Sequence, residues 1–181
     1  PLIDELKARL SFSVHAVSKA VTHRDLPPAR FSVVHVPASE LNEPSAGFRE
    51  ELKAAQKRGG AAVLETMLQQ AASQKRRYCV ERVLESLKDG QKVVVFTGRR
   101  KDCELFAEAV HKGIAKAKIV CPFWTAHGDV SDVKREEFRV AYMDSSGPAV
   151  LIGTWQAWGE SMNLNDCDYG QLVMLPWTPG D

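Results

Sequence analysis

The sequence has no long apolar run, no surplus of charge of either sign and few cysteines. No stretch of its 181 residues approaches the roughly eighteen apolar residues that cross a membrane, and its first residues, 1–5, lack both parts of a signal peptide. We therefore expect a soluble, cytoplasmic protein without a membrane partner. Lys and Arg number 24 against 23 Asp and Glu, a formal charge of +1, so any nucleic-acid binding must come from a local patch.

The four cysteines show no paired spacing of the kind that binds zinc. Cys103 and Cys121 stand among apolar neighbours, where a free cysteine behaves as a small hydrophobic residue. We expect all four thiols to be reduced and no metal site to be present. The set is Cys79, Cys103, Cys121 and Cys167.

Several catalytic motifs are missing as well. The sequence contains no G-x-x-x-x-G-K-[S/T] phosphate loop, no glycine-rich dinucleotide turn, no nucleophile elbow and no HExxH pair. We therefore expect no catalytic residue within the chain and no cofactor bound to the chain alone.

The chain is long enough for one main domain. A weak helical pattern in residues 1–30 ends at Pro27-Pro28 and predicts a leading linker, with the domain in 31–181. The chain starts with Pro1 and ends at Asp181 without a helix to close the fold, so we expect a monomeric piece of a longer protein.

Periodicity predicts alternating helices and strands. Residues 44–73 fit two helices that meet at Gly59-Gly60, and Ser131 is placed to cap a later helix with a face of Val133, Phe138, Ala141 and Tyr142. The other predicted helices cover residues 76–87 and 102–111. The predicted strands cover residues 31–36, 92–97, 119–124, 149–152 and 172–175. Strands separated by helices predict a doubly wound, mostly parallel α/β sheet.

Ligands of such a sheet bind beyond the carboxyl ends of its strands. Thr97-Gly98-Arg99-Arg100-Lys101 suits a phosphate, and Thr154 offers a hydroxyl at a similar position, although solvated cations and a turn-completing threonine fit equally well. Trp155 and Trp158 either pack in the core or stack on a base. His127 is either a catalytic base or a residue that shapes its loop.

Read in order, these loops resemble the motif series of the second RecA-like lobe of superfamily-two helicases, most closely the Swi/Snf-like group of bacteria and phages. The resemblance covers residues 26–181, with Ser161 at a usual glycine and no sixth motif. The segments that carry it are Leu26-Pro27-Pro28, Ala72-Ser73-Gln74-Lys75, residues 91–97, Ala126-His127-Gly128, Arg135 to Phe138, residues 150–168 and Leu175-Pro176-Trp177-Thr178-Pro179.

The resemblance implies roles for several of these residues. ATP and Mg²⁺ would be held mainly by an N-terminal RecA-like lobe of the same parent protein, and DNA would be the other partner. Gly159, Glu160 and Asn163 would lie near ATP or the surface between the lobes. The implied DNA contacts are Thr97, Gly98, Arg99, Arg100, His127, Gly128, Thr154 and Trp155.

Two alternatives remain open. The chain could be a noncatalytic nucleic-acid-binding or interaction module with the same fold. It could also be a free-standing α/β enzyme for a nucleotide or methyl donor, but such an enzyme needs a glycine-rich first loop and an acidic ribose ligand, which the sequence does not show.

Overall fold

The structure is a computed structural model that describes residues 32–158, 164 and 166–174. Contacts between Cα atoms divide the chain into two compact units, Pro1–His35 and Val36–Asp181. None of the helices that the structure describes is long and apolar enough to cross a membrane.

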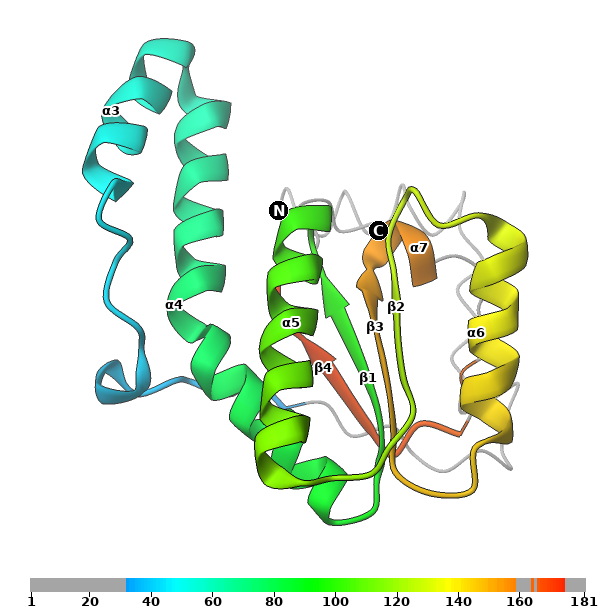
Figure 1. The fold of residues 1–181 in the computed structure, drawn as a ribbon. Coiled ribbons are helices and arrows are strands. Elements are labelled where there is room, and N and C mark those ends of the chain that lie inside the picture. The colour runs from blue at the N-terminus through cyan, green and yellow to red at the C-terminus, as the bar shows by residue number, and fades with distance from the viewer. Residues whose placement is uncertain (1–31, 159–163, 165, 175–181) are drawn as a thin grey trace, which may run out of the picture. The chain divides into compact units, whose positions relative to one another are not determined.

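The second unit is a parallel sheet with helices on both faces (Figure 1). Its four strands have the spatial order β2-β3-β1-β4, and every neighbouring pair is parallel. The predicted doubly wound α/β class is therefore confirmed. Along the chain the elements are η1 (Ala38–Glu40), α3 (Phe48–Arg58), α4 (Gly60–Lys88), β1 (Lys92–Thr97), α5 (Arg100–Ala117), β2 (Phe123–Ala126), α6 (Asp132–Asp144), β3 (Ala149–Thr154), α7 (Trp155–Trp158) and β4 (Tyr169–Leu172).

Two hydrophobic cores lie on the two faces of the sheet. Val93, Val95 and Ile152 point to the core shared with α4 and α5, whereas Val94 and Leu151 point to the core shared with α6 and α7. This alternation follows from the two-residue period of a strand. Both central strands are buried on both faces, which explains why their sequences are almost wholly apolar.

Helix α4 is longer than the sequence predicted. The predicted break at Gly59-Gly60 is confirmed, and Gly59 adopts φ 111° between α3 and α4. However, the helices predicted before residue 73 and after residue 76 form one helix of 29 residues. No glycine or proline separates them, so nothing in the local sequence ends the first helix.

Three predicted strands differ from the structure. Residues 32–36 form no strand, so that prediction is wrong for them: no described strand pairs with them. Strand β2 begins at Phe123 instead of residue 119, directly after Pro122, which has no N–H to donate. Strand β4 spans 169–172, whereas the prediction covered 172–175, of which residue 175 lies outside the described residues. An edge strand with a half-exposed Leu172 lacks the apolar signal of a central strand.

The α6 prediction is confirmed in part. The Ser131 hydroxyl accepts a hydrogen bond from the Lys134 N–H, as expected of an N-cap. Tyr142 is buried and Phe138 packs against the same core, but Val133 and Ala141 are exposed. The buried face of α6 is therefore narrower than the apolar face predicted from the sequence.

Trp158 packs directly over Gly153 of β3. Its indole is buried, and its Nε1 donates to the Ile152 carbonyl over 3.3 Å. A Cβ atom on Gly153 would lie 1.8 Å from that ring and 2.8 Å from the Ala126 carbonyl oxygen. Glycine at this position therefore lets α7 fold back on the sheet.

We expect Gly153→Ala to lower the free energy of unfolding by about 1–3 kcal/mol, because the added methyl group forces Trp158 away from the sheet. Urea unfolding monitored by far-UV circular dichroism measures this change. Gly147→Ala is the matched control, because a Cβ there meets nothing within 4 Å, and it should stay within about 0.5 kcal/mol of wild type. Equal stability of the two variants would contradict this packing.

Candidate functional site

The parallel register brings the ends of the strands to one edge of the sheet. Thr97 pairs with Thr154, and Ala126 pairs with Gly153, so the last residues of β1, β2 and β3 are neighbours. The loops that begin at Gly98, His127 and Trp155 therefore start side by side. We call this region, residues 97–104, 125–129 and 153–158, the carboxyl edge.

The hydroxyls of Thr97 and Thr154, two of the threonines of the carboxyl edge, make hydrogen bonds within the edge. The Thr97 hydroxyl is buried and donates to the Gly153 carbonyl over 3.3 Å. Thr154 is buried as well, and its hydroxyl accepts from the Ala157 N–H over 3.3 Å, which starts α7. In this conformation both hydroxyls hold the edge together. Their predicted contact with DNA remains a prediction.

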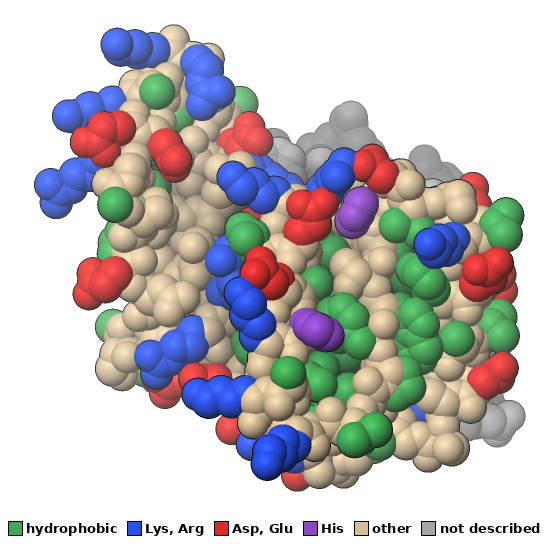
Figure 2. Space-filling view, in the orientation of Figure 1, with side chains coloured by type: hydrophobic (Ala, Val, Ile, Leu, Met, Phe, Trp, Pro, Cys, Tyr) green, Lys and Arg blue, Asp and Glu red, His purple; other side chains and the backbone are tan. Residues whose placement is uncertain are grey.

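The two arginines of the first loop are paired with carboxylates. Arg99 Nη1 lies 3.2 Å from Glu65 Oε1 on α4. Arg100 Nε donates to Glu104 Oε1 over 2.7 Å, and its Nη1 forms an ion pair with Asp129. Figure 2 accordingly shows Lys or Arg next to Asp or Glu around this end of the molecule. A phosphate that binds here must compete with these carboxylates.

Asp102 lies among cations in the first turn of α5. Burial raises the pKa of its carboxyl group, and the charges of Arg99 and Arg76 oppose that rise. Its Oδ2 is buried and has no hydrogen-bond partner among the described residues. A carboxylate in this place reduces the positive potential of the first loop.

His127 is the first residue of the second loop and lies near Glu104 of α5. Its Nε2 is 3.7 Å from Glu104 Oε1, while its buried Nδ1 has no hydrogen-bond partner within the described part of the chain. The Thr125 hydroxyl nearby is unpartnered in the same sense. Since buried polar atoms are normally hydrogen-bonded, unpartnered atoms of Asp102, Thr125 and His127 at one edge favour a site that takes a polar ligand.

The glycines of the first two loops differ in their surroundings. A Cβ atom on Gly98 would lie 2.8 Å from the terminal methyl group of Met174, so a flexible side chain covers this position. A Cβ on Gly128 would meet nothing within 4 Å. Only the second loop therefore leaves its glycine backbone open to a ligand.

The tryptophans of the third loop have different environments. Trp158 belongs to the core, whereas Trp155 is half-buried and stacks on Phe96, with ring centroids 5.0 Å apart and an interplanar angle of 12°. The indole Nε1 of Trp155 donates to the Met174 carbonyl over 3.1 Å. Trp155 thus links the end of β1 to the segment after β4, and its predicted contact with DNA remains a prediction.

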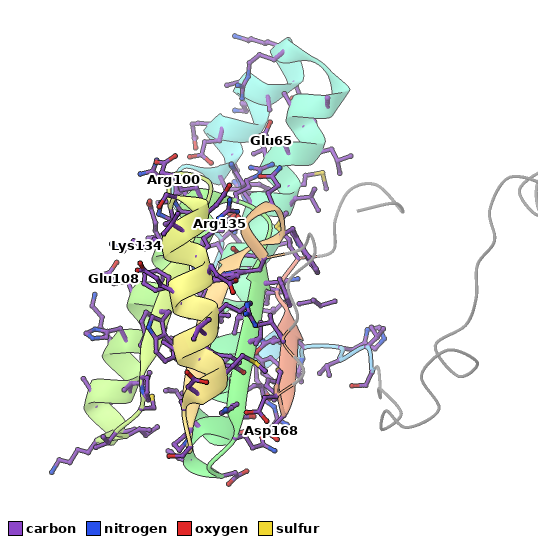
Figure 3. The ribbon with its side chains drawn as sticks, turned by 90° about the vertical axis from the view of Figure 1, so that its right-hand side faces the viewer. Glu65, Arg100, Glu108, Lys134, Arg135 and Asp168 are labelled. Atoms are coloured by element: carbon purple, nitrogen blue, oxygen red, sulfur yellow. The ribbon has the colours of Figure 1, made fainter. Side chains whose placement is uncertain are left out.

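Arg135 joins α6 to the carboxyl edge. Its Nη1 donates to the Ala157 carbonyl over 3.1 Å, and its Nη2 forms an ion pair with Asp132. Figure 3 shows Glu65, Arg100 and Arg135 at the same end of the molecule, with Asp168 at the other end.

The structure brings together most of the predicted DNA-contact residues at the carboxyl edge. The predicted interlobe residues Gly159, Glu160 and Asn163 lie outside the described residues.

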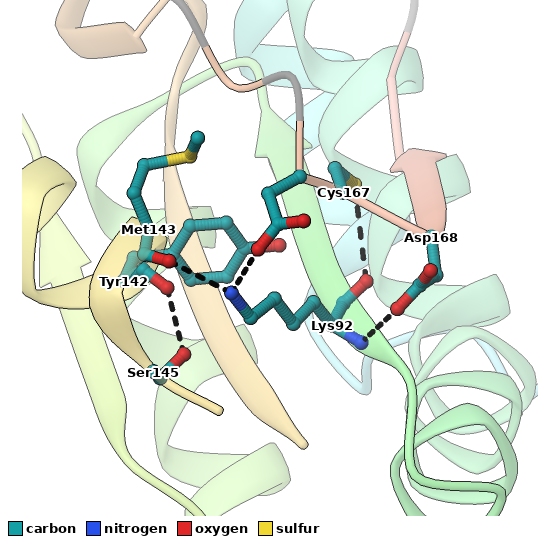
Figure 4. A network of polar contacts seen from close by, with 7 residues as sticks. Lys92, Tyr142, Met143, Ser145, Cys167 and Asp168 are labelled. Carbon is teal, nitrogen blue, oxygen red and sulfur yellow. Dashed lines mark hydrogen bonds and ion pairs between the residues drawn. The ribbon is translucent and has the colours of Figure 1, made fainter. Parts of the chain in front are cut away.

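A polar network at the opposite end of β1 was not predicted from the sequence (Figure 4). Lys92 is buried although it was assigned to a wholly apolar strand, and its Nζ donates to the Met143 carbonyl over 2.9 Å. The same ammonium group forms an ion pair with Asp166 and lies 5.8 Å from the centre of the Tyr142 ring. No local sequence signal distinguishes this lysine from a solvated one.

Backbone contacts complete the network. The Lys92 N–H donates to Asp168 Oδ2 over 2.8 Å, and the Asp168 N–H donates to the Lys92 carbonyl over 3.0 Å. The Cys167 thiol lies 3.2 Å from the Tyr169 carbonyl, and burial raises its pKa. These contacts fix residues 166–168 beside β1 and set the start of β4.

All four cysteines are free in the structure. Cys79 and Cys103 are buried, and burial raises the pKa of the Cys103 thiol to about 11. Among the residues that the structure describes, no group of three or more His, Cys, Asp or Glu is placed to hold a metal ion.

Comparisons with known proteins find a similarity of structure and no sequence family. No family model matches the chain, and no curated protein matches it. Among solved structures, the chain is similar to the Sulfolobus solfataricus SWI2/SNF2 ATPase core in complex with dsDNA, with 13% identity and a TM-score of 0.47. The similarity covers 73% of this chain and 39% of that one, so this chain spans about two fifths of that protein. The function must be inferred from the residues of this chain.

We expect Asp168→Ala to lower the free energy of unfolding by about 1–3 kcal/mol, because it leaves the Lys92 N–H without its acceptor. Asp168→Asn keeps an acceptor oxygen and should recover part of the loss. Asp129→Ala is the control: it removes an ion pair with Arg100 in which both side chains are more than half exposed, so it should cost less than about 1 kcal/mol. Urea unfolding tests the ranking, and a larger loss for Asp129→Ala would contradict it.

Proposed function

We propose that this chain is the second RecA-like lobe of a superfamily-two, Swi/Snf-like DNA helicase or translocase. The observation that carries the proposal is the carboxyl edge. Three segments that are far apart in the sequence begin side by side there, because β1, β2 and β3 are parallel and in register. Each of these segments resembles a helicase motif. This edge is where open parallel sheets bind their ligands.

The proposed role of the chain is to hold the backbone of one DNA strand. Arg99 and Arg100 supply charge, and the open loop at Gly128 lets backbone N–H groups approach a phosphate. Such contacts are independent of base sequence and weaken as salt rises. The carboxylates that pair with both arginines make the contact weak in the isolated chain.

ATP would bind between this lobe and another lobe that carries a phosphate loop. In this proposal that other lobe would also hold Mg²⁺. When bound there, ATP would supply the energy for opening and closing the two lobes. The part of this chain in that cycle is to hold DNA at the carboxyl edge while the lobe moves.

The ion pair between Arg99 and Glu65 allows a direct test of DNA contact. We expect Arg99→Gln to weaken DNA binding severalfold and to lower the salt slope by about one, since one phosphate contact is lost. Glu65→Gln should strengthen binding, because it frees the guanidinium group. Fluorescence anisotropy with a labelled duplex across a salt series measures both effects.

Glu136→Gln is the control for the added charge. Glu136 pairs with Arg139 on α6, so this substitution gives the same change in net charge away from Glu65. It should leave affinity nearly unchanged. If Glu136→Gln and Glu65→Gln strengthen binding equally, net charge explains the effect and Arg99 makes no specific contact.

The motor role itself is tested by ATP turnover. In a longer protein that joins this chain to a phosphate-loop lobe, we expect DNA to stimulate ATP hydrolysis, and Arg99→Ala or Thr154→Ala to reduce that stimulation. Thr154→Ser keeps the hydroxyl that starts α7 and should retain stimulation. The 181-residue chain alone should hydrolyse no ATP. Turnover by the chain alone, or a parent protein indifferent to DNA, would refute the motor role.

A further inference from the structure

A helical hairpin extends from the α/β part of this unit (Figure 1). It consists of α3 and the first part of α4, and Ala55 is buried where the two helices meet. The Ser45 hydroxyl also donates to Gln70 Oε1 over 3.1 Å, which ties the start of the hairpin to α4. The second half of α4 packs on the sheet through Val80, Val83 and Leu87. The hairpin is thus a continuation of a core helix.

The end of this hairpin carries only positive charge. Residues 52–64 include Lys53, Lys57 and Arg58 and no Asp or Glu. All three cations are exposed, and none forms an ion pair with any residue that the structure describes. Figure 2 shows Lys and Arg side chains at this end, with acidic side chains further down. We call residues 52–64 the basic tip.

The charge of the basic tip comes from its side chains. The carboxyl end of α3 and the amino end of α4 meet there, so the partial charges of the two helix ends offset each other. Cations are favourable in the last turn of a helix, which accounts for the presence of Lys57 and Arg58 in α3. It does not account for Lys53. Nor does it account for the lack of carboxylate partners at the tip, since the arginines of the carboxyl edge all have such partners.

The composition of the basic tip favours one kind of partner. Its exposed non-charged residues are Ala54, Gln56, Gly59, Gly60 and Ala61, and a Cβ atom on either glycine would meet nothing within 4 Å. Protein interfaces and membrane surfaces usually require bulky apolar or aromatic anchors, and none of these exposed residues is one. A phosphate backbone needs only accessible positive charge.

The position of the basic tip fits the proposed DNA contact. Glu65, the partner of Arg99, marks the level of the carboxyl edge along α4. Gly60 lies five residues nearer the tip, which is about 8 Å at the rise of an α-helix. Successive phosphates of one strand rise about 3.4 Å each along a duplex, so a backbone at Arg99 would reach the tip within roughly two or three nucleotides.

We propose that the basic tip is a second contact for the phosphate backbone of DNA, next to the carboxyl edge. This inference rests on the proposed function, because it assumes that DNA lies along that edge. Lys53, Lys57 and Arg58 supply the charge, and the rigid hairpin fixes their distance from the edge. The tip adds affinity without reading the base sequence.

The test replaces Lys53, Lys57 and Arg58 by Gln in the 181-residue chain. We expect at least a tenfold loss of affinity for a mixed-sequence duplex at low salt, and a decrease of about two to three in the salt slope, since three phosphate contacts are removed. Fluorescence anisotropy across a salt series measures both. Each single substitution should give a smaller loss in the same direction, and circular dichroism confirms that the variants fold.

The matched control is Lys88→Gln, Lys116→Gln and Lys118→Gln combined. These lysines are also exposed, but they lie at the ends of α4 and α5 away from the hairpin. The control removes equal charge and should change affinity less than threefold. Equal losses in both triple variants would overturn the proposal, because net charge would then explain binding.

Two further outcomes separate the proposals. If Arg99→Gln weakens binding but the tip variant does not, the basic tip is no contact while the proposed function stands. If the wild-type chain binds no DNA at low salt, both proposals fail. If polyglutamate of equal charge, or vesicles with anionic lipid, compete as well as DNA for the tip, its partner is another polyanion and the assignment to DNA is wrong.

Discussion

The parallel pairing of β1 with β3 is the constraint on which the rest of this structure depends. Six consecutive residue pairs, from Lys92 with Ala149 to Thr97 with Thr154, fix the two strands over their whole length. One end of this pair carries the Lys92 network, and the other end carries the two threonines. A shift by one residue would turn every buried valine to the opposite face, so the apolar cores on both faces maintain this register.

The register also determines how the carboxyl edge is built. The Thr97 hydroxyl can reach the Gly153 carbonyl only because the two strands end together. Gly153 then leaves room for Trp158, and the Arg135 guanidinium holds the carbonyl of Ala157 in the short helix α7. Side chains that look like ligand-binding groups in the sequence thus serve first to position the edge. The groups left to meet a ligand are the unpartnered polar atoms of Thr125 and His127, the open backbone at Gly128, and the arginines once a ligand displaces their carboxylates.

The sequence predicts most of the fold because its central strands carry a strong signal. The run 92–97 is apolar and bounded by Gly90 and Gly98, so its position could be predicted to the residue. Edge strands have no such signal: β4 reads Tyr-Gly-Gln-Leu, and its position depends on the contact of Asp168 with Lys92 across 76 positions of sequence. Periodicity in a local window cannot reveal a hydrogen bond of that range.

The candidate site was predictable in its location but not in its electrostatics. Residues after strands converge because parallel strands share a carboxyl end, and a sequence with alternating helices and strands is enough to predict this. Whether an arginine of the edge has a carboxylate partner depends on helices that are distant in the sequence. Glu65 reaches Arg99 because α4 is unbroken across residues 73–76, where the sequence predicted a new helix. The same long helix supports α3, and through α3 it supports the cations of the basic tip. One unbroken helix therefore carries Glu65, which pairs with Arg99 at the carboxyl edge, and also supports the hairpin, whose cations have no ion-pair partner among the described residues. A polyanion would thus meet unpaired positive charge at the hairpin and paired charge at the edge.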